Sequence, residues 1–172
     1  WICICWCILG NISSLAAAAE RNKGNALRPG DTIAVVSPAS PTDEADRQPT
    51  VKLLQSWGYH VVQAPTRHYG YFAGTDEERA AELNHYFKDD HVQAILCANG
   101  GYGSARILDK LDYSMIAKHP KLFIGFSDIT ALHTALGEKS HLVTIHGPME
   151  CTLNPAVSSA YTLRQFANGL SS

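Results

Sequence analysis

The chain of 172 residues lacks an excess of charge of either sign, and charged residues make up only 17% of it. Fourteen Lys and Arg stand against sixteen Asp and Glu, which leaves a formal net charge of -2. This balance gives no reason to expect nucleic acid or an anionic membrane as a partner, because both bind strongly basic surfaces. Small molecules or peptides are therefore the expected ligands.

The sequence also lacks a convincing membrane span, which needs about 20 predominantly apolar residues. Residues 1–9 are almost wholly apolar and residues 15–19 are small and apolar. This pattern is typical of a secretory signal peptide with an Ala-x-Ala cleavage site, although neither an initiator Met nor a basic segment precedes it. We assign residues 1–26 to an apolar leader and linker, and expect no stable membrane span after its removal. An exported or periplasmic location is favoured, with the cytoplasm as the alternative.

Cysteine is scarce outside this leader. Cys3, Cys5 and Cys7 lie inside it, and only Cys97 and Cys151 follow. Three cysteines at period two in an apolar run, without a histidine or further cysteine at ligand spacing, are weak evidence for a metal site. We expect neither a metal nor another cofactor, and interpret Cys97 as a small core residue at the end of a strand.

From residue 27 to residue 150, short apolar runs alternate with patterns typical of helices. Strands are expected at Thr32–Val36, Tyr59–Gln63, Val92–Cys97, Leu122–Ile124 and Leu142–Ile145. Helices are expected at about 43–57, 75–87, 105–111 and 128–136. This alternation predicts an α/β fold of three layers, with a mostly parallel, doubly wound sheet of flavodoxin-like or Rossmann-like type. Ligands of such sheets bind outside the carboxyl ends of the strands.

Local signals mark the ends of two helices. Asp43 is placed to cap the first helix, and Gly58 ends it, since glycine adopts the left-handed conformation without strain. Thr75 and Glu78 have the spacing of a capping box at the start of the next helix. We expect that helix to direct three apolar side chains inward, those of Ala80, Leu83 and Phe87.

Residues 121–133, Lys-Leu-Phe-Ile-Gly-Phe-Ser-Asp-Ile-Thr-Ala-Leu-His, predict a strand, a tight turn at Gly125 and a helix. Ser127 would then lie at the carboxyl edge of the sheet, in a first helical turn whose free N–H groups favour developing negative charge. That environment suits a nucleophile. The stretch is not the Gly-x-Ser-x-Gly elbow of hydrolases, because Ile129 replaces the second glycine. The alternative is that Ser127 or Asp128 only caps the helix.

A second glycine-rich turn, Asn99–Gly103, follows the third strand and should open on the same edge. Its spacing fits neither common phosphate-binding pattern. Its glycines could instead let backbone N–H groups approach a substrate oxygen, as an oxyanion hole requires. A purely structural tight turn is the alternative.

Eight histidines offer candidate bases for a serine nucleophile. His133 lies six residues further along the same predicted helix, so its side chain should point away from Ser127. His146, at the end of the last strand, is better placed, and its alternative role is that of a satisfied polar residue. No carboxylate stands out as the third member of a triad.

Four motifs, in this order, resemble the amino-terminal domain of the LD-carboxypeptidases. This family contains serine peptidases such as muramoyltetrapeptide carboxypeptidases and the immunity peptidases that act on the antibiotic microcin C. The likeness runs from about Leu27 to about Met149. The motifs are Gly-Tyr-Phe-Ala-Gly-Thr-Asp-Glu-Glu-Arg-Ala-Ala-Glu-Leu-Asn at 70–84, Gly-Gly-Tyr-Gly at 100–103, Ile-Gly-Phe-Ser-Asp-Ile-Thr-Ala-Leu-His at 124–133 and His-Gly-Pro-Met at 146–149.

The resemblance implies a serine hydrolase that removes a terminal D-alanine from an L-residue of peptidoglycan tetrapeptides, with a Ser-His-Glu triad. The family serine falls on Ser127. The amide of Asp128 and that of Gly101, or of its neighbour Gly100, would form the oxyanion hole.

Three further residues would then border the substrate, namely Asn99, Tyr102 and His146, and His146 becomes a residue at the edge of the site instead of the base. The family usually has Arg where this chain has Asn99. Asn cannot supply the charge with which Arg would pair a substrate carboxylate. A related serine peptidase acting on a peptide-nucleotide antibiotic or another modified peptide is therefore an alternative.

The triad His and Glu of the family belong to a carboxyl-terminal domain. Residues 151–172 are expected to begin the linker to that domain, with a short helix at 161–166. The fragment alone would then be inactive, or would be a non-catalytic module that binds a peptide. An exposed aromatic patch is expected where that domain would lie, and homodimerisation is left open. The patch comprises Tyr69, Tyr71, Phe72 and Tyr102.

Overall fold

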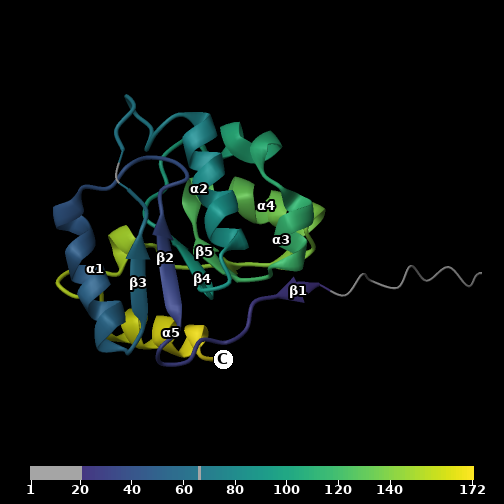
Figure 1. The fold of residues 1–172 in the computed structure, drawn as a ribbon. Helices are drawn as coiled ribbons and strands as arrows, with labels where there is room; N and C mark the ends of the chain where they lie inside the picture. Colours follow the sequence, from purple (N-terminus) through teal and green to yellow (C-terminus); the bar gives the residue numbers. More distant parts are fainter. Residues whose placement is uncertain (1–20, 66) are drawn as a thin grey trace, which may run out of the picture.

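The computed structural model describes residues 21–65 and 67–172, so the predicted leader over residues 1–20 lies outside the described residues. Five parallel strands form the main sheet in the order β3-β2-β4-β5-β7 (Figure 1). Their bounds are Thr32–Val36 for β2, His60–Gln63 for β3, Ala94–Cys97 for β4, Leu122–Gly125 for β5 and Ile145–His146 for β7. This is the flavodoxin-like order, which confirms the predicted α/β class.

Helices cover both faces of this sheet (Figure 1). The α-helices are α1 (Glu44–Ser56), α2 (Asp76–Lys88), α3 (Tyr113–Lys118), α4 (Thr130–Lys139) and α5 (Ala160–Leu170). Short 3-10 helices are η1 (Ser104–Lys110), η2 (Ser127–Ile129) and η3 (Glu150–Thr152). No helix in the described part of the chain is long and apolar enough to cross a bilayer.

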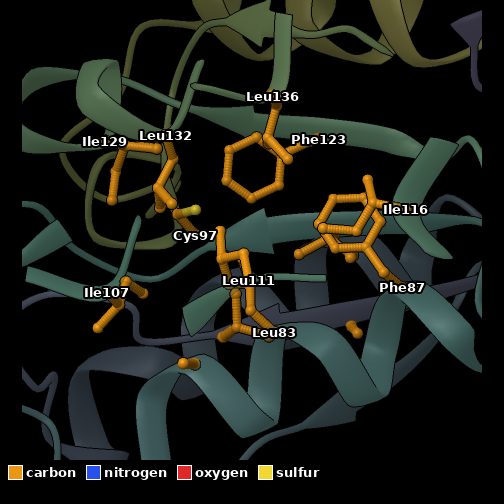
Figure 2. Packing of buried hydrophobic residues seen from close by; sticks show 14 of the residues in the cluster. Leu83, Phe87, Cys97, Ile107, Leu111, Ile116, Phe123, Ile129, Leu132 and Leu136 are labelled. Carbon is orange, nitrogen blue, oxygen red and sulfur yellow. The ribbon is translucent and has the colours of Figure 1, made fainter. Parts of the chain in front are cut away.

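One face of the sheet packs against α2, α3 and α4. Figure 2 shows side chains from α2, such as Leu83 and Phe87, facing Phe123 of β5. The rings of Phe87 and Phe123 stack with centroids 5.9 Å apart. Ala80, Leu83 and Phe87 are all buried, as the helical spacing predicted.

The other face packs against α1 and α5. Ile33 and Val35 of the central strand β2 point to this face, whereas Ala34 and Val36 point to the first, as a strand period of two requires. Helix α5 is longer than the short helix expected over residues 161–166. It belongs to the folded unit, because Phe166 and Leu170 are buried in this core.

The predicted strand at Leu142–Ile145 is divided between two sheets. Its first part, β6 (Leu142–Val143), pairs with β1 (Asn22–Lys23), and only β7 joins the main sheet. Strand β1 was not predicted from the sequence. The next residue, Gly24, packs closely against the start of β5; a Cβ there would lie 2.3 Å from the backbone nitrogen of Leu122.

A second difference concerns residues 104–118. The helix expected over 105–111 is the 3-10 helix η1, and α3 follows it as an additional helix. The side chain of Asp112 accepts a hydrogen bond from the amide of Met115, so this residue separates the two helices as an N-cap.

The helix ends predicted from the sequence were mostly correct. Thr75 and Glu78 form the expected reciprocal capping box, and Gly58 is left-handed at φ +92°. Asp43 occupies the N-cap position of α1, but its side chain makes no capping hydrogen bond, contrary to the prediction. It lies instead 3.7 Å from the ring nitrogen of His68.

The turn between β5 and α4 is held through the carbonyl oxygen of Gly125. This oxygen accepts hydrogen bonds from Nε2 of His133, at 2.9 Å, and from the amide of Gly147, at 3.1 Å. Nδ1 of His133 is buried and has no hydrogen-bond partner among the described residues. Burial lowers the pKa of His133, opposed by the bond to Gly125 and reinforced by the nearby His146. Burial thus favours the neutral form of His133.

Acid should destabilise the fold through His133. Its folded pKa lies below the ordinary value of 6.5, so the unfolded chain binds this proton first. The stability that depends on neutral His133 is thus present above pH 6.5 and is lost as the pH falls through the folded pKa. Denaturant titrations from pH 7.5 to pH 5 should show this decline, at no more than about 1.4 kcal/mol per pH unit from one proton.

The variant His133→Gln keeps a donor for the Gly125 carbonyl but cannot titrate, so its decline should be shallower. The variant His60→Gln, on an exposed position of β3, controls for the number of histidines. Equal pH dependence in the native chain and in His133→Gln would show that another group controls acid stability.

Candidate active site

The loops that follow β2, β4 and β5 meet at the carboxyl edge of the sheet. β2 pairs with β3 on one side and with β4 on the other. The connection that leaves β2 therefore runs to one side of it, and the connection from β3 to β4 returns to the other side. Such a switch point leaves a crevice where ligands of doubly wound sheets bind. The two glycine-containing turns predicted from the sequence both lie on this edge.

Ser127 occupies the tip of the turn after β5. Its side chain is exposed, and its φ of +60° is in the left-handed region, which costs a non-glycine residue roughly 1–3 kcal/mol. The sequence had assigned the sharp turn to Gly125, but Gly125 ends the strand without a positive φ. Glycine is needed there for space, because a Cβ would lie 2.8 Å from Cγ2 of Ile129.

The capping alternative for this turn is not supported. The 3-10 helix η2 and helix α4 have no side-chain cap, and the hydroxyl of Ser127 bonds to no described residue. The carboxylate of Asp128 instead accepts a hydrogen bond from the amide of Ser104, at 2.9 Å. The hydroxyl of Ser127 and the amide of Asp128 thus both remain available to a ligand.

The turn at Asn99–Gly103 lies directly against Ser127. A Cβ on Gly100 would be 3.4 Å from the hydroxyl oxygen of Ser127. The amide of Gly100 donates to the side chain of Asn99 at 2.9 Å, whereas the amide of Gly101 bonds to no described residue. Gly101 adopts a φ of +97°, which favours glycine. Of the two amides predicted as oxyanion donors, that of Gly101 is the unoccupied one.

Asn99 is half-buried beside a polar cavity of about 390 Å³. The side-chain oxygen of Asn99 accepts the hydrogen bond from Gly100, and no Lys or Arg among the described residues lines the cavity. The other lining residues are Pro41, Thr42, Asp43, Asp46, His68, Cys151 and Asn154. This cavity therefore offers hydrogen-bonding groups and carboxylates beside Asn99, the residue that precedes Gly100.

Tyr102 is 55% exposed and belongs to the predicted aromatic patch. Its ring lies 6.1 Å from that of Phe72, which in turn meets Tyr71 edge to face at 6.0 Å. Tyr69 and Tyr71 are also exposed, at 61% and 59%. The expected exposed aromatic surface is confirmed for the three tyrosines, whereas Phe72 is half-buried. The patch borders the glycine turn.

Neither histidine considered as a base contacts Ser127. His133 is bonded to the carbonyl of Gly125, and no hydrogen bond joins it to Ser127 among the described residues. His146 is exposed and packs against Phe126 and His133, with ring centroids 6.3 Å and 5.8 Å away. Its ring borders an apolar groove between β7 and α5 instead of the polar cavity.

Two side chains that the sequence did not single out shape the glycine turn. Ser40, in the loop after β2, donates from both its amide and its hydroxyl to the carbonyl of Gly100, at 3.1 Å and 2.6 Å. Arg79 of α2 is buried and donates to the carbonyl of Gly103 at 2.9 Å. The sequence signal that could have identified Arg79 is its position in the family motif at residues 70–84.

A buried ion pair was also missed. Arg47 of α1 donates from Nε to Glu150 at 3.0 Å, and both side chains are essentially inaccessible to solvent. Burial raises the pKa of Glu150, and Arg47 opposes this rise. The hydroxyl of Thr50 also donates to the carbonyl of Glu150, at 2.9 Å. These contacts fix the segment after β7, where the side chain of Met149 lies beside Gly100.

Comparisons with known proteins agree on the family. The model of the LD-carboxypeptidase N-terminal domain matches residues 33–147. The "Probable murein peptide carboxypeptidase" of Bacillus subtilis is 48% identical over 132 residues, which cover 76% of this chain and 41% of that protein.

Two solved structures share the fold. An MccF-like protein from Bacillus anthracis is 34% identical with a TM-score of 0.82, over 88% of this chain and 47% of its own. A muramoyltetrapeptide carboxypeptidase from Oxalobacter formigenes is 34% identical with a TM-score of 0.76, over 82% of this chain and 48% of its own. The chain thus spans less than half the length of these relatives. Because the matched residues run from β2 to β7 and include both turns of the candidate site, the chain belongs to the LD-carboxypeptidase family and carries its amino-terminal domain.

Proposed function

We propose that this chain carries the nucleophile of a serine LD-carboxypeptidase that hydrolyses the L,D bond to a terminal D-alanine in peptidoglycan-derived tetrapeptides. The observation that carries the proposal is Ser127, an exposed serine held in the left-handed conformation beside Gly100. Family membership and the murein peptide named for the Bacillus subtilis relative support this choice of substrate.

In the proposed mechanism the hydroxyl oxygen of Ser127 attacks the carbonyl carbon of the L-residue while a general base removes the hydroxyl proton. The amides of Asp128 and Gly101 stabilise the negative oxygen of the tetrahedral intermediate. D-Alanine leaves when its nitrogen accepts the proton, and water then hydrolyses the acyl-enzyme. This chain would supply the nucleophile and the oxyanion hole.

We further propose that the base and its carboxylate partner belong to the remainder of the protein, as in other members of the family. His133 is engaged with the Gly125 carbonyl, and no described side chain bonds to the hydroxyl of Ser127. Asn99, Tyr102 and His146 would border the substrate around this centre. The exposed aromatic patch would face the domain that brings the base.

The first prediction is that Ser127→Ala in the full-length protein abolishes release of D-alanine from a muramyl tetrapeptide. The loss should be at least about 10⁴-fold in kcat, because no other group can form the acyl-enzyme. Chromatography of the released D-alanine measures it. Ser114→Ala, an exposed serine of α3, is the matched control. Turnover retained by Ser127→Ala would remove this residue from the mechanism.

The second prediction concerns residues 21–172 expressed alone. A serine hydroxyl without a general base is a weak nucleophile, so this fragment should release no measurable D-alanine. Activity should return when the carboxyl-terminal half of a full-length relative is fused after Ser172. Titration with a muropeptide distinguishes a fragment that binds without turnover from one that does not bind. Release by the isolated fragment would place the base within this chain, and His146→Gln would then be tested first.

A related peptidase acting on a peptide-nucleotide or another modified peptide is the second candidate function. Asn99 favours it, because Asn99 brings no positive charge to the cavity and its side-chain oxygen is already bonded to Gly100. The structural likeness to an MccF-like protein is compatible with this candidate.

The variant Asn99→Arg should shift substrate preference toward peptides with a free terminal carboxylate. A new charge-assisted hydrogen bond would raise the ratio of kcat/KM for the acid over the corresponding amide by about 10-fold. A panel of tetrapeptide acids, amides and nucleotide conjugates measures the ratio. Asn168→Arg, at an exposed position of α5, controls for net charge. An unchanged ratio in Asn99→Arg would show that Asn99 does not set specificity.

A further inference from the structure

Ser40 makes an unusual pair of contacts for a residue in a connecting loop. It lies after β2, is only 8% exposed, and directs both of its donors to one acceptor, the carbonyl oxygen of Gly100. A carbonyl oxygen has two lone pairs, so this single residue satisfies the whole acceptor. The orientation of the Gly100 carbonyl is therefore set by Ser40.

The orientation of this carbonyl also decides where the next amide points. The peptide unit is planar and none of the described peptide bonds is cis, so the N–H of Gly101 points opposite to the carbonyl of Gly100. It is directed away from Ser40 and bonds to no described residue. A rotated peptide would present a carbonyl oxygen in place of this donor, and that oxygen would repel a developing oxyanion.

The surroundings hold Ser40 itself in place. The carbonyl of Ala39 accepts a hydrogen bond from the amide of Ala73 at 3.0 Å, and that of Pro38 accepts one from the buried Arg79. Space is equally limited on the glycine side, because a Cβ on Gly101 would lie 2.8 Å from the hydroxyl oxygen of Ser40. The loop after β2 thus serves as a rigid support for the glycine turn.

We propose that Ser40 is a positioning residue for catalysis, which fixes the Gly100–Gly101 peptide so that the Gly101 amide can stabilise the oxyanion. This inference rests on the proposed function, in which Ser127 is the nucleophile and Gly101 an oxyanion donor. Ser40 does not touch the substrate. Its contribution should therefore be felt in the transition state and not in the binding of the ground state.

The test compares Ser40→Ala, Ser40→Thr and Ser37→Ala in the full-length protein. Ser40→Ala keeps the backbone donor but loses the hydroxyl, and kcat for D-alanine release should fall about 10-fold with KM changed less than 2-fold. Ser40→Thr restores a hydroxyl and should recover kcat to within about 3-fold. Ser37→Ala removes a buried hydroxyl of the same loop that bonds to no described residue, and should leave kcat and KM unchanged.

A peptide boronic acid supplies a second measurement, because its tetrahedral adduct with Ser127 places an oxygen in the oxyanion hole. Ser40→Ala should bind this inhibitor about 10-fold more weakly and bind the tripeptide product as the native protein does. If thermal unfolding shows that Ser40→Ala is not folded, Ser40→Cys takes its place, since a thiol is a weaker hydrogen-bond donor than a hydroxyl.

The possible outcomes separate the two proposals. Loss of activity in Ser127→Ala together with native kcat and boronate affinity in the Ser40 variant would overturn the role of Ser40 alone. A rise in KM with unchanged kcat would also overturn it, because it would indicate substrate binding. Activity retained by Ser127→Ala would remove the proposed function on which the inference depends.

Discussion

The candidate site depends on one close approach, that of the Gly100 backbone to the side chain of Ser127. The Cα of Gly100 faces the Ser127 side chain on one side, and the methyl group of Met149 lies 3.5 Å from the position a Cβ would occupy. Three loops, after β4, β5 and β7, therefore converge on a point where a Cβ would already lie 3.3 to 3.5 Å from its neighbours. A residue larger than glycine would require Ser127 or Met149 to shift by a few tenths of an ångström.

The strained conformation of Ser127 is maintained by contacts with its neighbours and not by the residue itself. Two donors on the Gly125 carbonyl and the bond from the Ile129 amide to the Phe126 carbonyl define the backbone on both sides of the turn. The opposite wall is held in the same manner, by Ser40 on Gly100 and Arg79 on Gly103. The site is thus built mainly from side chains that hold backbone carbonyls, and the amides of Gly101 and Asp128 bond to no described residue.

Much of this arrangement could be predicted from the sequence, because local patterns control it. The buried strands, the capping box at Thr75, the position of Ser127 at a turn and the exposed aromatic patch all follow from periodicity, spacing or motif. The division of residues 142–146 between two sheets could not be predicted, because an apolar run looks the same whichever strand it pairs with. The contacts of Ser40 and Arg79 were equally hidden, since they join segments about 24 to 60 residues apart.

The pairing of β1 with β6 has a consequence for the order in which the chain folds. Asn22 aligns with Leu142, and its side chain donates to the carbonyls of Ala117 and Ser140, so its partners are synthesised about 100 residues later. The central strand β2 meets β3 and β4 much earlier along the chain. During synthesis, β1 is therefore made first but can pair with β6 only after most of the sheet has formed. Until α3, α4 and β6 have been synthesised, β1 lacks these partners and is accessible to factors that bind the nascent chain.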